Sequence, residues 1–155
     1  GFPISGLLAK NKAFKNILPG SMSSTHSGNP MACAAGIATI EEINRLKLVK
    51  KSFQNGKYFH DLLNKLMEEY PQFIREINGK GLIAAIIFYK NKKIDGVKLA
   101  NYMCEQLLKQ NLIVVKTGRE SIKLGPPLII TRSQIKDGVN KIRKSLDISI
   151  KKNKF

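Results

Sequence analysis

Hydrophobic residues recur at helical spacing in four segments of the chain, which predicts four helices. Asn29-Pro30 is a favoured start for the first, because Asn caps helices well and Pro suits the first helical position. This helix is rich in small residues and continues through Ile43. The other helices are expected over residues 50–70, over residues 96–110, and after Thr131, with Ile135, Val139, Ile142 and Leu146 on one face. Thr131 and Gln134 have the spacing of a capping box.

Shorter apolar runs predict the strands. Residues 3–9 form one such run, which indicates a buried strand. Residues 73–77 and 82–89 flank the turn Gly79-Lys80-Gly81 and predict a hairpin, and residues 112–115 and 122–130 are further extended segments. From about residue 72 onward the pattern is therefore β-α-β-β-α. This order predicts an α+β sandwich with helices on one face of a small sheet.

The composition is that of a globular protein, with 43% of the 155 residues hydrophobic and 25% charged. No apolar run approaches the ~20 residues of a membrane helix, so we expect no membrane partner and a cytoplasmic location. Cys33 and Cys104 lie far apart inside helical patterns, which predicts buried free thiols. His26 and His60 are also distant from each other, so we expect no metal site.

The net charge of +16 allows a second interpretation, a small basic α+β protein that binds nucleic acid. The lysines, however, are spread along the whole chain, and only residues 151–154 form a dense basic segment. The aromatic residues do not alternate with basic ones, and the sequence contains no Trp. We therefore expect no nucleic-acid partner and retain this function only as an alternative.

One loop, residues 23–30, has the residue types of an anion site. It combines hydroxyl side chains and a glycine with the start of a predicted helix. Helix N-termini offer free N–H groups and a positive dipole, which suit a phosphate. A plain helix cap on a polar loop is the alternative interpretation. No Ser-His-Asp set, glycine-rich phosphate loop or other self-contained catalytic set is found elsewhere in the sequence.

Four segments, in the same order, resemble the class III aminotransferases, a family of pyridoxal-phosphate enzymes that includes the ornithine, acetylornithine and 4-aminobutyrate aminotransferases. Residues 24–35 are similar to the family pattern S-T-(aromatic or His)-x-G-N-P-x-x-x-A-A, and residues 1–6 to its glycine-rich stretch. Residues 79–83 resemble its G-x-G-L-M segment, and residues 122–131 its I-R-x-x-P-P-L-x-I-T segment. The resemblance implies an α/β fold of fold type I, represented here by the end of the large domain and a small α+β C-terminal domain.

The resemblance also implies a cofactor, pyridoxal 5'-phosphate, and places residues around it. The counterpart of Thr25 donates its hydroxyl to the cofactor phosphate in the neighbouring subunit of a homodimer, and Ser24 would lie beside it. The lysine that forms a Schiff base with the cofactor would precede Gly1, so none of the 155 residues is expected to be catalytic. Lys123 stands where many members have an arginine that holds a substrate carboxylate, and Arg119 is near enough in sequence to compensate.

The expected domains are residues 1–28 as the tail of the large cofactor-binding domain, 29–71 as connecting helices, 72–147 as the small domain and 148–155 as a basic tail. The expected function is that of part of an aminotransferase that moves an amino group from an amino acid or amine to a 2-oxo acid. An amino-acid epimerase or aminomutase of the same family is the alternative, because the two activities differ in where a proton returns. The residues present, alone, are expected to be inactive.

Overall fold

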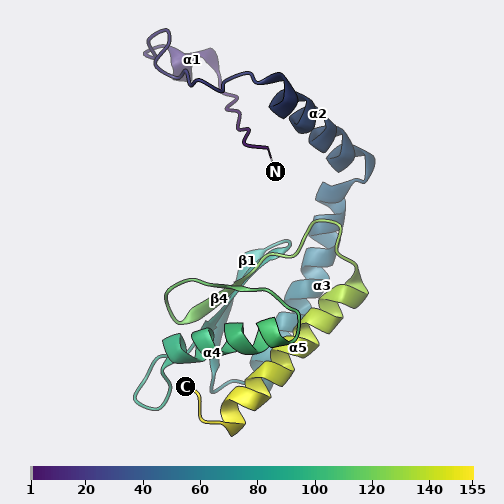
Figure 1. Cartoon of the computed structure of the whole chain (residues 1–155). Coiled ribbons are helices and arrows are strands. Elements are labelled where there is room, and N and C mark those ends of the chain that lie inside the picture. Colours follow the sequence, from purple (N-terminus) through teal and green to yellow (C-terminus); the bar gives the residue numbers. More distant parts are fainter. Residues whose placement is uncertain (1) are drawn as a thin grey trace. The chain divides into compact units, whose positions relative to one another are not determined.

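The computed structural model describes residues 2–155, which form two compact units, Gly1–Lys47 and Leu48–Phe155. The boundary falls within the residues expected as connecting helices, and the second predicted helix belongs to the later unit. Figure 1 labels the helices and strands of both units.

The first unit contains a short helix, α1 (Asn11–Phe14), and a longer one, α2 (Pro30–Arg45). The Asn29 side chain accepts hydrogen bonds from the backbone N–H groups of Met31 and Ala32, at 3.0 and 3.1 Å. Pro30 occupies the first turn, where a missing N–H costs nothing. The predicted start of this helix is confirmed.

The strand predicted for residues 3–9 is wrong. These residues are exposed coil, and no described residue pairs with them as a neighbouring strand. Strands depend on hydrogen bonds to another segment, and an apolar run does not specify that partner. The side chain of Ile4 lies instead against α2, since a Cβ built on Gly36 would be 3.2 Å from Ile4 Cδ1.

The second unit contains a four-stranded antiparallel sheet and three helices. The strands are β1 (Ile74–Lys80), β2 (Ile83–Phe88), β3 (Val115–Lys116) and β4 (Ser121–Leu124), in the spatial order β1-β2-β4-β3. The helices are α3 (Leu48–Glu69), α4 (Gly96–Lys109) and α5 (Arg132–Lys151). The predicted β1–β2 hairpin, the three helices and the overall α+β arrangement are confirmed.

The third and fourth strands are shorter than predicted. The backbone N–H of Leu112 donates to Leu107 O at 2.9 Å, so residue 112 helps to cap the C-terminus of α4 and does not pair in a strand. Pro126 and Pro127 follow β4 after Gly125 and lack the N–H that a strand ladder needs. Apolar content alone predicted longer strands than the backbone hydrogen bonds permit.

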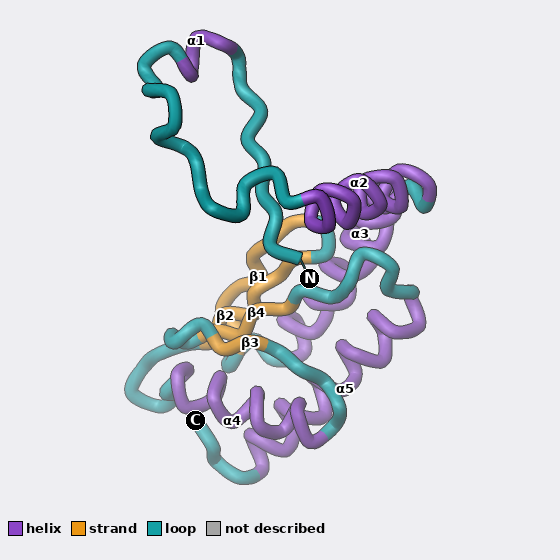
Figure 2. The backbone as a smooth tube through the Cα atoms, turned by 45° about the horizontal axis from the view of Figure 1, so that its top comes forward, coloured by secondary structure: helices purple, strands orange, loops and turns teal. Residues whose placement is uncertain are grey.

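The core of the second unit lies between one face of the sheet and the helices (Figure 2). Ala84, Ile86 and Phe88 alternate along β2 and are buried, whereas Ile83 is 58% exposed. Ile135, Val139, Ile142 and Leu146 of α5 are all buried, as the sequence predicted. One face of the sheet is therefore covered by helices, and the opposite face is open among the described residues.

The end of the chain and the two cysteines differ from expectation. The helix α5 continues through Lys151, and the ring of Phe155 lies edge-on against Phe73 with centroids 5.1 Å apart. The basic segment thus begins inside a helix and ends on an aromatic contact. Cys33 and Cys104 are free thiols, as predicted, but they are half-buried where full burial was expected.

Candidate functional site

The loop before α2 is folded by its own hydroxyl groups. The Ser24 backbone N–H donates to Ser27 Oγ at 3.1 Å, and the two serine hydroxyls are 3.0 Å apart. The Ser27 N–H donates to Ser24 O at 3.0 Å, and Gly28 takes a positive φ of 68°. These bonds bend the chain tightly between Ser24 and the cap of α2 at Asn29.

Thr25 occupies the exposed tip of this bend. Its side chain makes no hydrogen bond to any other residue of the described chain, so its hydroxyl can turn toward a ligand. The Ser24 hydroxyl already has a protein partner in Ser27. The arrangement suits Thr25 as a donor to an anion such as a phosphate, with Ser24 fixing the bend.

Lys123 lies on the open face of the sheet in the second unit. It is opposite Ala85 of β2 and Val115 of β3, and residues directly opposite each other in a ladder share a face. Its neighbours along the strand, Ile122 and Leu124, are buried on the helix side. Strand alternation therefore fixes the direction of Lys123 away from the core.

A cavity of about 670 Å³ lies over this face. Its lining contains two lysines, Lys80 and Lys123, and the hydroxyl residue Ser52. The remaining lining is largely apolar and includes Leu82, Ile83, Ile113, Val114, Val115, Pro126 and Leu128. Within the described chain, neither lysine forms an ion pair. A cationic, partly apolar cavity of this kind suits an organic anion.

Arg119 lies apart from this cavity. It is in the turn between β3 and β4, where its backbone N–H donates to Thr117 Oγ1 at 3.3 Å. The residues that line the Lys123 cavity do not include it. The two predicted substrate-binding residues are therefore not brought together in this cavity by the second unit.

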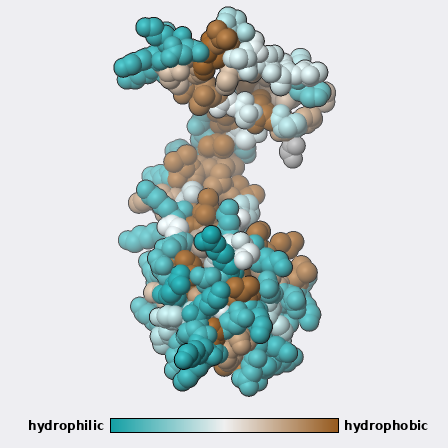
Figure 3. Space-filling view, turned by 90° about the vertical axis from the view of Figure 1, so that its left-hand side faces the viewer, coloured by the Kyte–Doolittle hydropathy of each residue, from teal (hydrophilic) through white to brown (hydrophobic). Residues whose placement is uncertain are grey.

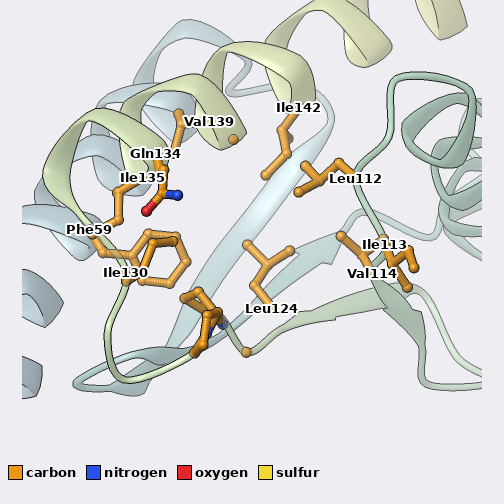
Figure 4. Close-up of a pocket in the computed structure, with 14 residues that line it drawn as sticks. Phe59, Leu112, Ile113, Val114, Leu124, Ile130, Gln134, Ile135, Val139 and Ile142 are labelled. Carbon is orange, nitrogen blue, oxygen red and sulfur yellow. The ribbon is translucent and has the colours of Figure 1, made fainter.

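A second cavity, of about 230 Å³, adjoins the first and is almost wholly apolar (Figure 4). Phe59, Ile130, Ile135 and Leu124 point into it, together with one polar side chain, Gln134. The Gln134 Oε1 accepts from the Thr131 N–H at 2.9 Å, so its carbonyl is engaged in the cap of α5. This cavity has no charged group for an anion, and the Lys123 cavity is the stronger candidate.

The titratable groups with shifted pKa values lie away from both cavities. The Arg143 guanidinium of α5 donates to both carboxylate oxygens of Glu69, at 2.6 and 3.0 Å, and lowers the pKa of that carboxyl. Burial, and then the 2.7 Å hydrogen bond to Asp147, raises the pKa of Tyr70. These contacts tie the end of α3 to α5 and serve packing.

Two further features of the surface and of the sequence bear on function. Hydrophilic atoms dominate the lower part of the space-filling view, with hydrophobic patches between them (Figure 3). Among residues 2–155, no helix is long and apolar enough to cross a membrane, and no cluster of His, Cys, Asp and Glu is suited to a metal ion. The sequence did not single out Lys80 as a candidate, although it lines the same cavity as Lys123.

Comparison with known proteins identifies relatives for nearly the whole chain. A family model described as aminotransferase class-III matches residues 1–146. The acetylornithine aminotransferase of Prochlorococcus marinus is 34% identical over 135 residues, which are 87% of this chain and 31% of that protein. The ornithine aminotransferase of Oceanobacillus iheyensis is 32% identical over 145 residues, which are 94% of this chain and 34% of that protein.

A solved structure agrees with these matches. The acetylornithine aminotransferase from Elizabethkingia anophelis superposes with a TM-score of 0.79 at 33% identity, over 91% of this chain and 34% of that one. The likeness confirms the α/β class and the fold-type I architecture that the sequence predicted. The chain spans about a third of the length of the relatives it matches.

Proposed function

Because the chain belongs to the class III aminotransferase family, we propose that it is the C-terminal portion of a pyridoxal-phosphate-dependent aminotransferase. The reaction would move an amino group from an amino acid or amine to a 2-oxo acid. The observation that carries the proposal is the match over residues 1–146. It is supported by the two relatives, which are named for acetylornithine and ornithine transamination.

The loop before α2 would contribute to the cofactor site. When bound, pyridoxal phosphate supplies the electron-withdrawing group that stabilises negative charge on the substrate carbon. The exposed hydroxyl of Thr25 fits a role as donor to the phosphate, because it has no other partner in the described chain. Ser24 would support it through its contacts with Ser27. In a homodimer this loop would reach the cofactor of the neighbouring subunit.

The open face of the sheet would contribute to the substrate site. Lys123 is proposed to hold a substrate carboxylate, since it faces a cavity with apolar walls and no competing ion pair in the described residues. A lysine is a point charge, whereas an arginine presents a planar fork to a carboxylate. Arg119 would take part only if the β3–β4 turn lies near the substrate in the assembled enzyme.

The proposed domain plan follows from the same assignment. Residues 1–28 would complete a large cofactor-binding domain, 29–71 would connect it to the small domain of residues 72–147, and 148–155 would form a basic tail. The lysine that binds the cofactor covalently would lie upstream of residue 1. Residues 1–155 would therefore be inactive when produced alone.

The test uses the full-length product of the gene that encodes this chain. Visible absorbance from bound pyridoxal phosphate should change when an amino donor is added, and a 2-oxo acid should be released. Thr25→Ala should weaken cofactor binding about tenfold, on the order of one charged hydrogen bond, while Thr39→Ala, on an exposed face of α2, should not. Racemised or rearranged amino acid without a 2-oxo product would support the epimerase or aminomutase alternative.

Salt-sensitive binding of nucleic acid, with no uptake of pyridoxal phosphate, would refute the proposal. That result would favour the basic binding-protein alternative, because phosphate contacts by Lys and Arg weaken steeply as salt is raised. We also propose that the aminotransferase is located in the cytoplasm.

A further inference from the structure

The turn Gly79-Lys80-Gly81 holds Lys80 in a fixed place at the end of the hairpin. Gly79 has φ 139° and Gly81 has φ 60°, backbone conformations that residues with a Cβ seldom adopt. A Cβ on Gly79 would also overlap the carbonyl oxygen of Ile83. Glycine is therefore required on both sides of Lys80, and the conformation of this turn is specific.

The same turn is packed against α3. A Cβ built on Gly56 would lie 2.5 Å from Gly81 Cα, so the two backbones touch where neither residue has a side chain. Ser52, one turn earlier in α3, lies over Gly81 as well, with its Oγ 3.3 Å from a Cβ built there. These contacts fix the end of the β1–β2 hairpin relative to the helix.

Lys80 and Lys123 face the same side of the sheet from opposite sides of β2. Lys80 is opposite Ile83, and Lys123 is opposite Ala85, two residues further along the strand. With strands about 4.8 Å apart and a rise of about 3.4 Å per residue, their Cα atoms are about 12 Å apart. Each lysine side chain extends about 6 Å on a flexible stem, so both ammonium groups can reach one small ligand.

We propose that Lys80 is a second anion-binding residue of the Lys123 cavity and selects ligands that carry two acidic groups. The inference rests on the proposed function only in taking this cavity as the substrate site. Ile83 and Ala85 form the apolar strip between the two lysines. A ligand with a carboxylate at each end of a short aliphatic chain matches this order of charge, apolar strip and charge.

Among the described strand residues on this face, the one carboxylate, that of Glu76, lies too far away to neutralise the site. Glu76 is opposite Ile87, four residues from Lys80 along β1, which is about 13 Å. The ion pair of Arg75 and Glu120, at 3.7 Å, engages another carboxylate of the same unit. Both lysines thus keep their charge available to a ligand.

The test is calorimetric titration of the full-length protein with glutarate, a diacid, and butyrate, a monoacid. Lys80→Gln should weaken glutarate binding about three- to fivefold, the upper part of the range of a partly exposed ion pair, and change butyrate binding less than about twofold. Lys80→Arg keeps the charge and should bind glutarate within about twofold of the original protein. Lys116→Gln is the matched control, because Lys116 is opposite Ile122 and faces the helix side of the same sheet.

The outcomes separate this proposal from the proposed function. The idea is overturned if Lys80→Gln changes glutarate and butyrate binding equally, if Lys116→Gln has the same effect, or if glutarate does not bind the original protein. Circular dichroism of each variant identifies misfolding; if Lys80→Gln misfolds, Lys80→Met, which also removes the charge, repeats the same titrations. Loss of the aminotransferase assignment would appear separately, as a failure to take up pyridoxal phosphate, and would leave the glutarate titration interpretable.

Discussion

Adding one methyl group at Gly56 tests the contact between α3 and the hairpin turn. In Gly56→Ala the new Cβ would lie 2.5 Å from Gly81 Cα, 2.6 Å from its carbonyl carbon and 2.7 Å from its oxygen. Carbon atoms in good van der Waals contact are about 3.5–4.0 Å apart. All three neighbours are backbone atoms, so no side-chain rotation relieves the overlap.

The magnitude follows from two opposed terms. In a helix interior, Ala is more favourable than Gly by about 1 kcal/mol, because Gly loses more backbone entropy. Overpacking a close contact costs about 1–3 kcal/mol, and a backbone-to-backbone overlap belongs at the upper end. We therefore expect Gly56→Ala to lower the free energy of unfolding by about 1–2 kcal/mol.

Gly138→Ala is the matched control. Gly138 lies inside α5, and a Cβ built there meets no atom within 4 Å. This variant should gain the helix propensity without an overlap and raise the free energy of unfolding by about 0.5–1 kcal/mol. Urea denaturation of the full-length protein, followed by circular dichroism, gives both values. Hydrogen exchange then locates the loss of protection in α3 and the β1–β2 hairpin.

A Gly56→Ala protein as stable as Gly138→Ala would refute the reasoning. It would mean that the helix and the turn move apart at little cost, and the fixed position of Lys80 would lose its support. Equal destabilisation by both variants would also count against it, because helix propensity would then have been misjudged at two sites.

Three other changes test separate contacts of the second unit. Thr131→Ala removes the side chain that accepts the Gln134 N–H at 3.3 Å and should cost about 1 kcal/mol of unfolding free energy. Glu69 has its pKa lowered from 4.5 by Arg143, so the pair stabilises the fold above about pH 4.5 and loses its effect as the pH falls through the lowered value. Glu69→Gln lacks this ion pair, so its free energy of unfolding should fall less than that of the original protein as the pH is lowered below about 4.5. Equal falls in the two proteins would contradict this prediction. His60→Leu removes a buried Nε2 that has no hydrogen-bond partner within residues 2–155. It should raise the free energy of unfolding by about 1 kcal/mol and therefore raise the melting temperature. A lower melting temperature would contradict this prediction.

The helices were predictable because their signals are local. The 3.6-residue period, the Asn29 cap and the Thr131 capping box each act within a few residues along the chain. The four apolar positions of α5, Ile135 to Leu146, are buried as that period requires. The family resemblance was equally readable, since it depends on short motifs such as residues 24–35.

Residues 3–9 and the ends of β3 and β4 show where local reasoning stopped. The first run was apolar enough for a strand but has no strand partner among the described residues. Apolar side chains also extended the predicted fourth strand to residue 130, whereas Pro126 and Pro127 end the ladder after Leu124. Strand formation depends on the partner and on available N–H groups, which hydrophobicity does not report.

The candidate site was only half determined by the sequence. The family resemblance indicated Thr25 and Ser24 as candidates for the phosphate and Lys123 and Arg119 for a carboxylate, and the hydroxyl residues before a predicted helix independently suited an anion. The tertiary structure alone decided that Lys80 shares a cavity with Lys123 and that Arg119 does not line it. The physical reason is that cross-strand register brings residues more than 40 positions apart onto one face, and register is set by backbone pairing between distant segments.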